Sequence, residues 1–308
     1  MTRDDLRSQL DRYLELKIAL GQERRRLERN LRAFIDYRHT HGKDGEISNQ
    51  LVLDWVCSTK CGPAGQRLRL SRARGFLHYL RASFPNTQVP GFNLIAGPTR
   101  PNPYIYSQEE ITALIKAAEA LSPRDSLRPL THATFIGLLA GSGLRMGEAI
   151  RLKDTDVSLG QNPAVITVRE SKFKKSRLVP LHPTVGEKLN AYRKRKGRSE
   201  SFFIDDRGRA LHPSLVREAF VTIRKRANIT STADGRHPTL HALRHTFAVN
   251  RLLRWYQEGR DINRWLPHLS VYLGHAKPEY TYWYLTATPE LLRQASDVFE
   301  QYAGGGRP

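Results

Sequence analysis

A set of side chains in the second two-thirds of the chain could together cut a phosphodiester. The guanidinium groups of Arg145 and Arg244 carry paired N–H donors that suit the two non-bridging oxygens of a phosphate. A tyrosine hydroxyl can attack phosphorus, and a lysine or a histidine can move the protons. This chemistry would cleave a nucleic-acid backbone without a metal ion. The sequence supplies such groups in five short stretches: Gly143–Glu148, Ser171–Lys175, His241–His245, Leu273–His275 and Tyr282–Tyr284.

Arg145 and Glu148 stand three residues apart, directly after the turn-forming residues 141–143. This spacing puts both side chains on one face of a helix, where they could form an ion pair. A surface ion pair without a function is the alternative for this motif alone. A glycine-rich turn would, however, bring Arg145 to a helix start, where backbone N–H groups also favour an anion.

Lys172 belongs to a basic segment between two stretches rich in β-branched residues, so a hairpin turn is predicted there. The residues alone allow three roles for this turn. It could be a solvated surface, a clamp on phosphates, or the source of a proton for a leaving 5′ oxygen. The other basic side chains predicted to contact DNA here are Lys174, Lys175 and Arg177.

His241 and Arg244 are three residues apart on a predicted helix and therefore lie on one face of it. Arg244 stands in an otherwise apolar stretch, so we expect it to be partly buried and to need an anionic partner. That partner is either a substrate phosphate or a carboxylate of a structural salt bridge. We expect His245 to pack or to cap within the structure.

His275 follows Gly274 at the predicted end of a helix, where a histidine often serves only as a C-terminal cap. Tyr280 and Tyr284 would share one face of the next helix. The spacing therefore leaves both tyrosines as candidate nucleophiles, although aromatic residues at such spacing commonly belong to a core.

The charge of the chain favours a polyanionic partner. Its 308 residues include 50 Lys and Arg against 30 Asp and Glu, which gives a net charge of +20 and a pI near 10.3. Each phosphate that such a surface neutralises releases condensed counterions. Hydrophobic residues at 39% and charged residues at 26% predict a folded, soluble protein rather than a disordered one.

Cysteine usage and the polar N-terminus favour a reducing cytoplasm. Cys57 and Cys61 alone make no disulfide framework, and no second Cys or His pair stands beside them to complete a zinc site. There is no signal-peptide pattern and no apolar run of membrane-spanning length. We also find no phosphate-binding Gly-x-x-x-x-Gly-Lys-Ser/Thr loop and no acidic cluster for two magnesium ions. We therefore expect no metal, no cofactor and no membrane partner.

The elements that must position these groups predict two domains. Residues 1–84 read as a helical DNA-binding domain, with Ser48 capping one of its four helices. Residues 85–106, rich in Pro and Gly, predict an extended linker. Residues 107–308 predict a mainly α domain with a small antiparallel β-sheet, opened by a capping box at Ser107. The last helix of the first domain has an apolar side predicted to run from Leu68 to Leu80, interleaved with arginines. These arginines form either a solvated polar face or a surface that faces phosphates, and the predicted DNA contacts among them are Arg67, Arg69, Arg72 and Arg74.

Within the second domain the hydrophobic patterns place the main elements. The predicted helices are 131–142, 183–195, 213–227, 240–257, 262–273 and 288–302. The predicted strands are 164–168, 177–181 and 202–204.

The order of these motifs resembles that of the tyrosine recombinase (phage integrase) family, most strongly from about residue 131 to 290. Gly-Leu-Arg145-x-x-Glu148 resembles the first arginine box of that family. Lys172, in Lys-x-x-x-x-Arg-Leu-Val-Pro, matches the family's catalytic lysine in its hairpin. The arginine-rich front domain resembles the family's core-binding domain, of SAM-like fold, and the second its mixed α/β catalytic domain.

The later motifs extend the resemblance. His241-x-x-Arg244-His245 resembles the His-x-x-Arg box, although many members have Asp where Ala242 stands. Leu-Gly-His275 resembles the following box. Tyr284, nine residues after His275, takes the position of the nucleophile, which favours it over Tyr280.

The resemblance implies a role for each residue. Arg145 and Arg244 would hold the scissile phosphate, and Tyr284 would attack it to form a 3′-phosphotyrosine. Lys172 would protonate the 5′ oxygen. His275 would assist at the phosphate, His241 would assist at the tyrosine, and Glu148 would orient the arginine site.

The resemblance also implies partners and a setting. The two domains would clamp double-stranded DNA, and four protomers would assemble on two DNA sites, exchanging a C-terminal helix. A helix that packs on its own core is the alternative. The expected outcome is integration or excision of a mobile element, on the nucleoid of a bacterial cytoplasm. Two alternatives stay open: a type IB topoisomerase-like enzyme, and an architectural or regulatory DNA-binding protein with idle catalytic groups.

Overall fold

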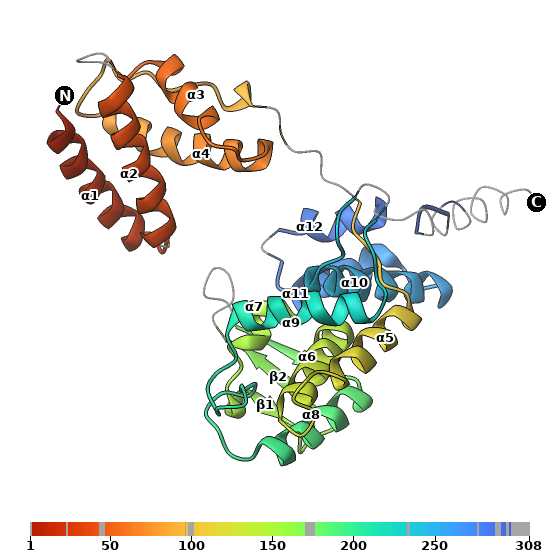
Figure 1. The fold of residues 1–308 in the computed structure, drawn as a ribbon. Helices are drawn as coiled ribbons and strands as arrows, with labels where there is room; N and C mark the ends of the chain where they lie inside the picture. Colours follow the sequence, from red (N-terminus) through yellow and green to blue (C-terminus); the bar gives the residue numbers. More distant parts are fainter. Residues whose placement is uncertain are drawn as a thin grey trace, which may run out of the picture. The chain divides into compact units, whose positions relative to one another are not determined.

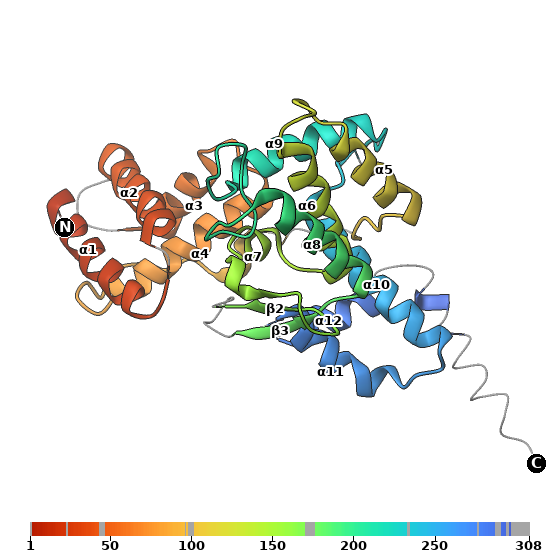
Figure 2. The same ribbon diagram turned by 90° about the horizontal axis from the view of Figure 1, so that it is seen from below.

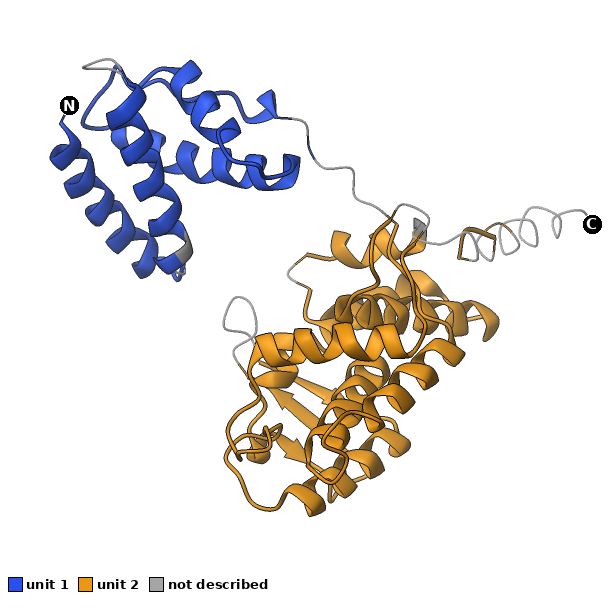
Figure 3. Cartoon of the chain, in the orientation of Figure 1, with its two compact units in different colours: residues 1–101 blue, residues 102–308 orange. Residues whose placement is uncertain are grey.

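The computed structural model describes residues 2–22, 24–42, 47–95, 97, 102–169, 176–232, 235–275, 277–286, 291–293 and 296. The chain divides into two compact units, residues 1–101 and residues 102–308 (Figure 3). The division falls inside the segment 85–106 that was predicted to be a linker.

The described residues of unit 1 form four α-helices, as its apolar periodicity predicts (Figure 1). They are α1 (Arg3–Ala19), α2 (Arg24–His41), α3 (Asn49–Cys57) and α4 (Pro63–Leu80). Their core is centred on aromatic rings, with Phe34 and Trp55 in edge contact at 5.1 Å between ring centroids. Ser48 caps α3 as predicted, because its hydroxyl accepts the Leu51 N–H at 3.2 Å.

The apolar side of α4 differs from the prediction at one position. Leu68 is 51% exposed, and Leu70 is buried in its place. At 3.6 residues per turn, the nine residues from Leu68 to Leu77 are about two and a half turns, so the two side chains point to opposite sides.

The predicted linker is shorter than its composition suggests. Ile95, which follows a short 3-10 helix, η1 (Phe92–Leu94), is buried in the core of unit 1. At the other end, Tyr106 is buried in the core of unit 2, and its N–H donates to the hydroxyl of Thr246 at 2.8 Å. Proline and glycine predict backbone without regular secondary structure, but the two ends of such a segment can still be buried in the cores of the units that they join.

In its described residues, unit 2 is mainly α with one small antiparallel sheet, which confirms the predicted fold class. The sheet has the order β1 (Val157–Ser158), β2 (Val165–Val168), β3 (Arg177–Pro180), and Val168 pairs with Arg177. Figure 2 shows β2 and β3 side by side, with α11 against β3. The helices are α5 (Gln108–Glu119), α6 (Arg128–Ser142), α7 (Met146–Ile150), α8 (Pro183–Lys196), α9 (Pro213–Arg226), α10 (Leu240–Gln257), α11 (Ile262–Leu273) and α12 (Glu279–Tyr282), with 3-10 helices η2 (Asp154–Asp156) and η3 (Trp283–Thr286).

Local signals fixed several boundaries in unit 2. The capping box is present at the start of α5: Ser107 Oγ accepts the Glu110 N–H at 3.1 Å, and the Glu110 carboxylate accepts the Ser107 N–H at 2.9 Å. The strand predicted at 202–204 is wrong, because the only β-pairing described for this segment is one isolated bridge, between Ile204 and Ala210. Most of the helix predicted at 288–302 lies outside the described residues.

Two apolar clusters hold unit 2 together. One lies around α6 and the sheet, and the other joins α10, α11 and η3. Leu291 is fully buried in the second cluster. No helix in the described part of the chain is long and apolar enough to cross a membrane.

Candidate active site

Two helix ends provide the framework of the site. Helix α6 ends at Ser142 with Gly143 at φ +62°, and α11 ends at Leu273 with Gly274 at φ +67°. Both glycines adopt the left-handed conformation that commonly ends a helix, and they do so without steric strain because glycine has no Cβ. The last carbonyls of a helix have no partner within it and carry its negative end, so they attract cations.

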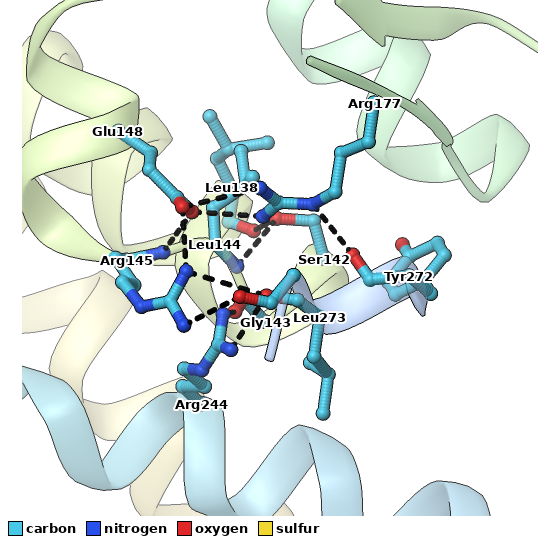
Figure 4. Close-up of polar contacts among 11 residues, drawn as sticks. Leu138, Ser142, Gly143, Leu144, Arg145, Glu148, Arg177, Arg244, Tyr272 and Leu273 are labelled. Atoms are coloured by element: carbon cyan, nitrogen blue, oxygen red, sulfur yellow. Dashed lines mark hydrogen bonds and ion pairs between the residues drawn. The ribbon is translucent and has the colours of Figure 1, made fainter. Parts of the chain in front are cut away.

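Arg244 binds both helix ends at once (Figure 4). Its Nη1 donates to the carbonyl of Gly143 at 2.7 Å, and its Nη2 donates to the carbonyl of Leu273 at 2.6 Å. The side chain is 1% exposed, so the predicted burial is confirmed. Burial, followed by the charge of Arg145, lowers the pKa of Arg244 to about 10, which leaves it protonated at neutral pH. Its described partners are backbone carbonyls and not the carboxylate of a salt bridge.

Arg145 also reaches the end of α11 (Figure 4). It stands at the N-cap of α7, as its glycine-rich turn predicts. Its Nη2 donates to the carbonyl of Gly274 at 2.9 Å, and its Nη1 lies 3.5 Å from the carbonyl of Leu273. The two guanidinium groups therefore converge on one oxygen, that of Leu273. The Arg145 side chain stays 31% exposed.

Glu148 holds the charges of this arrangement together. Its carboxylate accepts Arg145 Nη1 at 2.7 Å and the Arg145 N–H at 2.9 Å, so the predicted ion pair is confirmed. It also accepts two N–H groups of Arg177, at 2.9 and 3.2 Å. Burial opposes ionisation, but the hydrogen bonds and charges of the two arginines outweigh it and lower the pKa of Glu148 to about 2. The surface ion pair that was the alternative for this motif is thus buried on its Glu148 side, whereas Arg145 keeps part of its exposure.

Arg177 lies elsewhere than predicted. We expected it on the exposed basic turn, facing DNA. Its side chain is 8% exposed, and its Nε donates to the carbonyl of Tyr272 at 2.8 Å while its fork binds Glu148. The reason is the strand direction: Arg177 is the first residue of β3, which packs against α11. Arg177 therefore braces the arginine site rather than extending from the turn.

His275 follows the end of α11 directly, as predicted, and is half-buried. Its Nδ1 lies 2.6 Å from the hydroxyl of Thr281, which is fully buried. Burial, with the charges of Arg244 and Arg145, lowers the pKa of His275 to about 3. The imidazole is therefore neutral at physiological pH and can donate one hydrogen bond without a charge. Its ring stacks on that of Tyr284, with 6.2 Å between centroids.

The two candidate tyrosines do not share a helix face. Tyr280 lies in α12 and is 44% exposed, whereas Tyr284 lies in η3 and is 2% exposed. The helix changes from α to 3-10 geometry between them, which was not visible in the spacing. The hydroxyl of Tyr284 is 2.9 Å from Nδ1 of His245.

The histidines of α10 lie next to this tyrosine. His241 is exposed, and its ring meets that of His245 edge-on at 4.6 Å between centroids. The contact of His245 with the candidate nucleophile could not be predicted from the sequence, because it joins two segments 39 residues apart. Thr281, as the partner of His275, was also missed, since a threonine six residues away carries no local pattern.

The remaining predicted residues divide into two groups. Lys172, Lys174 and Lys175 lie outside the described residues. In unit 1, Arg69 stacks on Trp55 at 4.1 Å and donates to the Trp55 carbonyl at 2.7 Å, which makes it a structural residue.

The other predicted DNA contacts of α4 keep more freedom. Arg67 and Arg74 lie over the half-exposed ring of Phe92, at 5.0 and 5.7 Å from its centroid. Arg72 has no ion-pair partner among the described residues. In the part of the chain that the structure describes, no group of three His, Cys, Asp or Glu side chains could hold a metal ion.

Comparison with known proteins gives a consistent result. Residues 105–290 match the phage integrase family. The protein named "Putative integrase/recombinase y4rB" of Sinorhizobium fredii is 36% identical over 307 residues, which cover 96% of this chain and 97% of that protein. Tyrosine recombinase XerA of Thermococcus kodakarensis is 31% identical over 63% of this chain and 62% of its own. In fold, a lambda integrase tetramer bound to a Holliday junction matches with a TM-score of 0.67 and 20% identity, over 91% of this chain and 76% of that one.

Proposed function

Because the chain belongs to the phage integrase family and is thus a site-specific tyrosine recombinase, we propose that it cleaves and rejoins DNA through a 3′-phosphotyrosine on Tyr284. The reaction would need neither metal nor ATP, and its outcome would be integration or excision of a mobile element.

The observation that carries the proposal is the convergence of Arg145 and Arg244 on the carbonyl of Leu273. Two guanidinium groups aimed at one oxygen are arranged as donors to an atom with partial negative charge. A non-bridging phosphate oxygen bears more charge than a carbonyl and binds such donors more strongly. Donors placed in advance also stabilise the charge that develops at phosphorus in the transition state.

The surrounding residues supply the other functions. Tyr284 would attack phosphorus and leave a free 5′ hydroxyl, to which Lys172 would give a proton. His275, neutral at working pH, would donate a hydrogen bond to a non-bridging oxygen, and His241 would assist at the tyrosine. The bond energy is retained in the phosphotyrosine, so a second 5′ hydroxyl can attack it and complete the exchange.

DNA binding would be shared between the units. The net charge of +20 favours counterion release from DNA. In unit 1 we propose Arg67, Arg72 and Arg74 as phosphate contacts. In unit 2 we propose Lys174 and Lys175. The setting we propose is the nucleoid of a bacterial cytoplasm.

Assembly would follow the arrangement described for lambda integrase, a tetramer bound to a Holliday junction. We propose a homotetramer on two double-stranded DNA sites. The fully buried Leu291 ties the start of the C-terminal segment to the core of its own unit. Any exchange between protomers would therefore involve residues that follow it.

The test uses nicked DNA from the ends of the element that carries the coding sequence. Wild type and Tyr284→Phe are incubated with it in EDTA without ATP, and a denaturant-resistant protein–DNA adduct is sought. We expect an adduct with wild type alone. An adduct that survives the substitution would move the nucleophile to another residue, with Tyr280→Phe as the next variant. DNA binding without any adduct would favour the idle-site alternative. A parallel assay on an un-nicked, supercoiled plasmid that carries the same ends tests the topoisomerase, which relaxation without strand exchange would favour.

A further inference from the structure

We infer that His245 is the general base that takes the hydroxyl proton of Tyr284 as the phenolic oxygen attacks phosphorus. The inference rests on the function proposed above. Its basis is the 2.9 Å contact between His245 Nδ1 and Tyr284 Oη. This is the distance at which a base can take the proton directly, without an intervening water.

The His245 ring is held in this orientation by aromatic neighbours. It meets His241 edge-on at 4.6 Å, Trp283 at 5.5 Å and Tyr284 at 5.6 Å between ring centroids. His245 is half-buried, and Tyr284 is 2% exposed. Bulk water therefore has little access to the hydroxyl, and a protein group must take its proton.

The position of His245 couples the base to the phosphate site. It follows Arg244 on α10, and Arg244 binds the helix ends where the phosphate oxygen would lie. The ring of His275 also stacks on that of Tyr284, with 6.2 Å between centroids. Among the contacts that the structure describes for His245, the titratable partners are His241, on its own helix, and Tyr284, on η3.

Proton transfer and attack on phosphorus form one step. The Oη–H bond breaks and an Nδ1–H bond forms on neutral His245, while Oη bonds to phosphorus and the bond from phosphorus to the 5′ oxygen breaks. The leaving oxygen takes its proton from Lys172. In the reverse direction the imidazolium returns its proton to the tyrosine. His241, which the family resemblance implied at this step, is then the neighbour of the base rather than the base itself.

The test compares adduct formation by wild type, His245→Asn and His245→Ala on the nicked DNA described above, from pH 5 to 9. An asparagine amide can occupy the Nδ1 position and hold the hydroxyl, but it cannot take a proton. We expect His245→Asn to bind this DNA as wild type does, by fluorescence anisotropy, and to form adduct about 100-fold more slowly. The acid limb of its pH–rate profile should disappear, and added imidazole should restore part of the rate of His245→Ala.

His268→Asn is the matched control. It replaces a helical histidine of the same unit whose Nδ1 binds a backbone carbonyl at 3.1 Å, outside the site. A wild-type rate in His245→Asn would overturn the inference, and so would a slow rate with an unchanged acid limb. Failure of the proposed function would look different, because wild type itself would then form no adduct that depends on Tyr284.

Discussion

Replacing Glu148 by glutamine removes the negative charge that both Arg145 and Arg177 contact, while the side chain keeps its size. Arg177 is 8% exposed and has no other described carboxylate partner, so its charge would remain buried without a counter-ion. Removing one partner of a buried ion pair costs about 3–5 kcal/mol. Glu148→Gln should therefore destabilise unit 2 by an amount of this order.

The lowered pKa of Glu148 also determines how much its carboxylate contributes to the free energy of unfolding. It falls from 4.5 to about 2, and each pKa unit corresponds to about 1.4 kcal/mol, so the carboxylate contributes about 3 kcal/mol to folding. Because the pKa is lower in the folded state, this contribution is complete above pH 4.5 and is lost as the pH falls toward 2. At pH 3, about half of it should remain.

Urea unfolding of the full chain, followed by tryptophan fluorescence, measures the effect. A Trp55→Phe background leaves Trp255, Trp265 and Trp283, all in unit 2, as the reporters. In this background we compare Glu148→Gln with its parent at pH 7 and pH 3. The loss of unfolding free energy should be about 3 kcal/mol at pH 7 and about half of that at pH 3.

Glu200→Gln is the matched control. Glu200 also makes an ion pair, with Lys153 at 3.0 Å, but the two side chains are 81% and 57% exposed. An exposed pair contributes little to stability, so this variant should unfold at the parent's urea midpoint. Equal effects of the two substitutions, or a Glu148 effect that does not change with pH, would refute the reasoning.

Three further predictions follow from the same contacts. Gly274→Ala should lower Tm more than Gly259→Ala, although both glycines have positive φ. A Cβ at position 274 would lie 2.6 Å from a guanidinium nitrogen of Arg177, whereas a Cβ at position 259 would have no atom within 4 Å. Equal shifts of Tm would contradict this prediction. His275, with its pKa lowered from 6.5 to about 3, should reduce stability as the pH falls from 6.5 toward 3, since only the unfolded chain binds that proton; urea midpoints of His275→Gln should show a flatter pH dependence than wild type. Arg72→Gln should reduce the slope of log K against log salt for DNA binding by about 0.9, whereas Arg69→Gln should leave the slope unchanged and lower the Tm of the chain.

Local patterns predicted the features that depend on neighbours in the sequence. The cap of α5 by Ser107, the start of α7 at Arg145 and the end of α11 at Gly274 follow from residues within one helical turn. The burial of Arg244 followed from its apolar neighbours on α10. These features need no knowledge of the tertiary structure.

Contacts between distant segments could not be predicted in this way. Arg177 and Glu148 are 29 residues apart, and the sequence of the hairpin does not show which of its basic side chains turns inward. The family resemblance pointed to Tyr284, but its contact with His245 depends on how η3 packs on α10. The error at Leu68 is of another kind, because the 3.6-residue repeat of α4 by itself places Leu68 on the side opposite to Leu77.

The partners of Arg244 are main-chain atoms, and this has a consequence for how the site tolerates sequence change. A substitution at Gly143 or Leu273 cannot delete the carbonyl that Arg244 binds; it can only move it. In a saturation-mutagenesis experiment, these positions should therefore respond to backbone geometry and side-chain volume, and Arg244 to the identity of its functional group. The backbone conformation, and not the identity of any side chain, therefore sets the two carbonyl positions that Arg244 binds. The residues at these positions can change during evolution while the hydrogen bonds of Arg244 are kept.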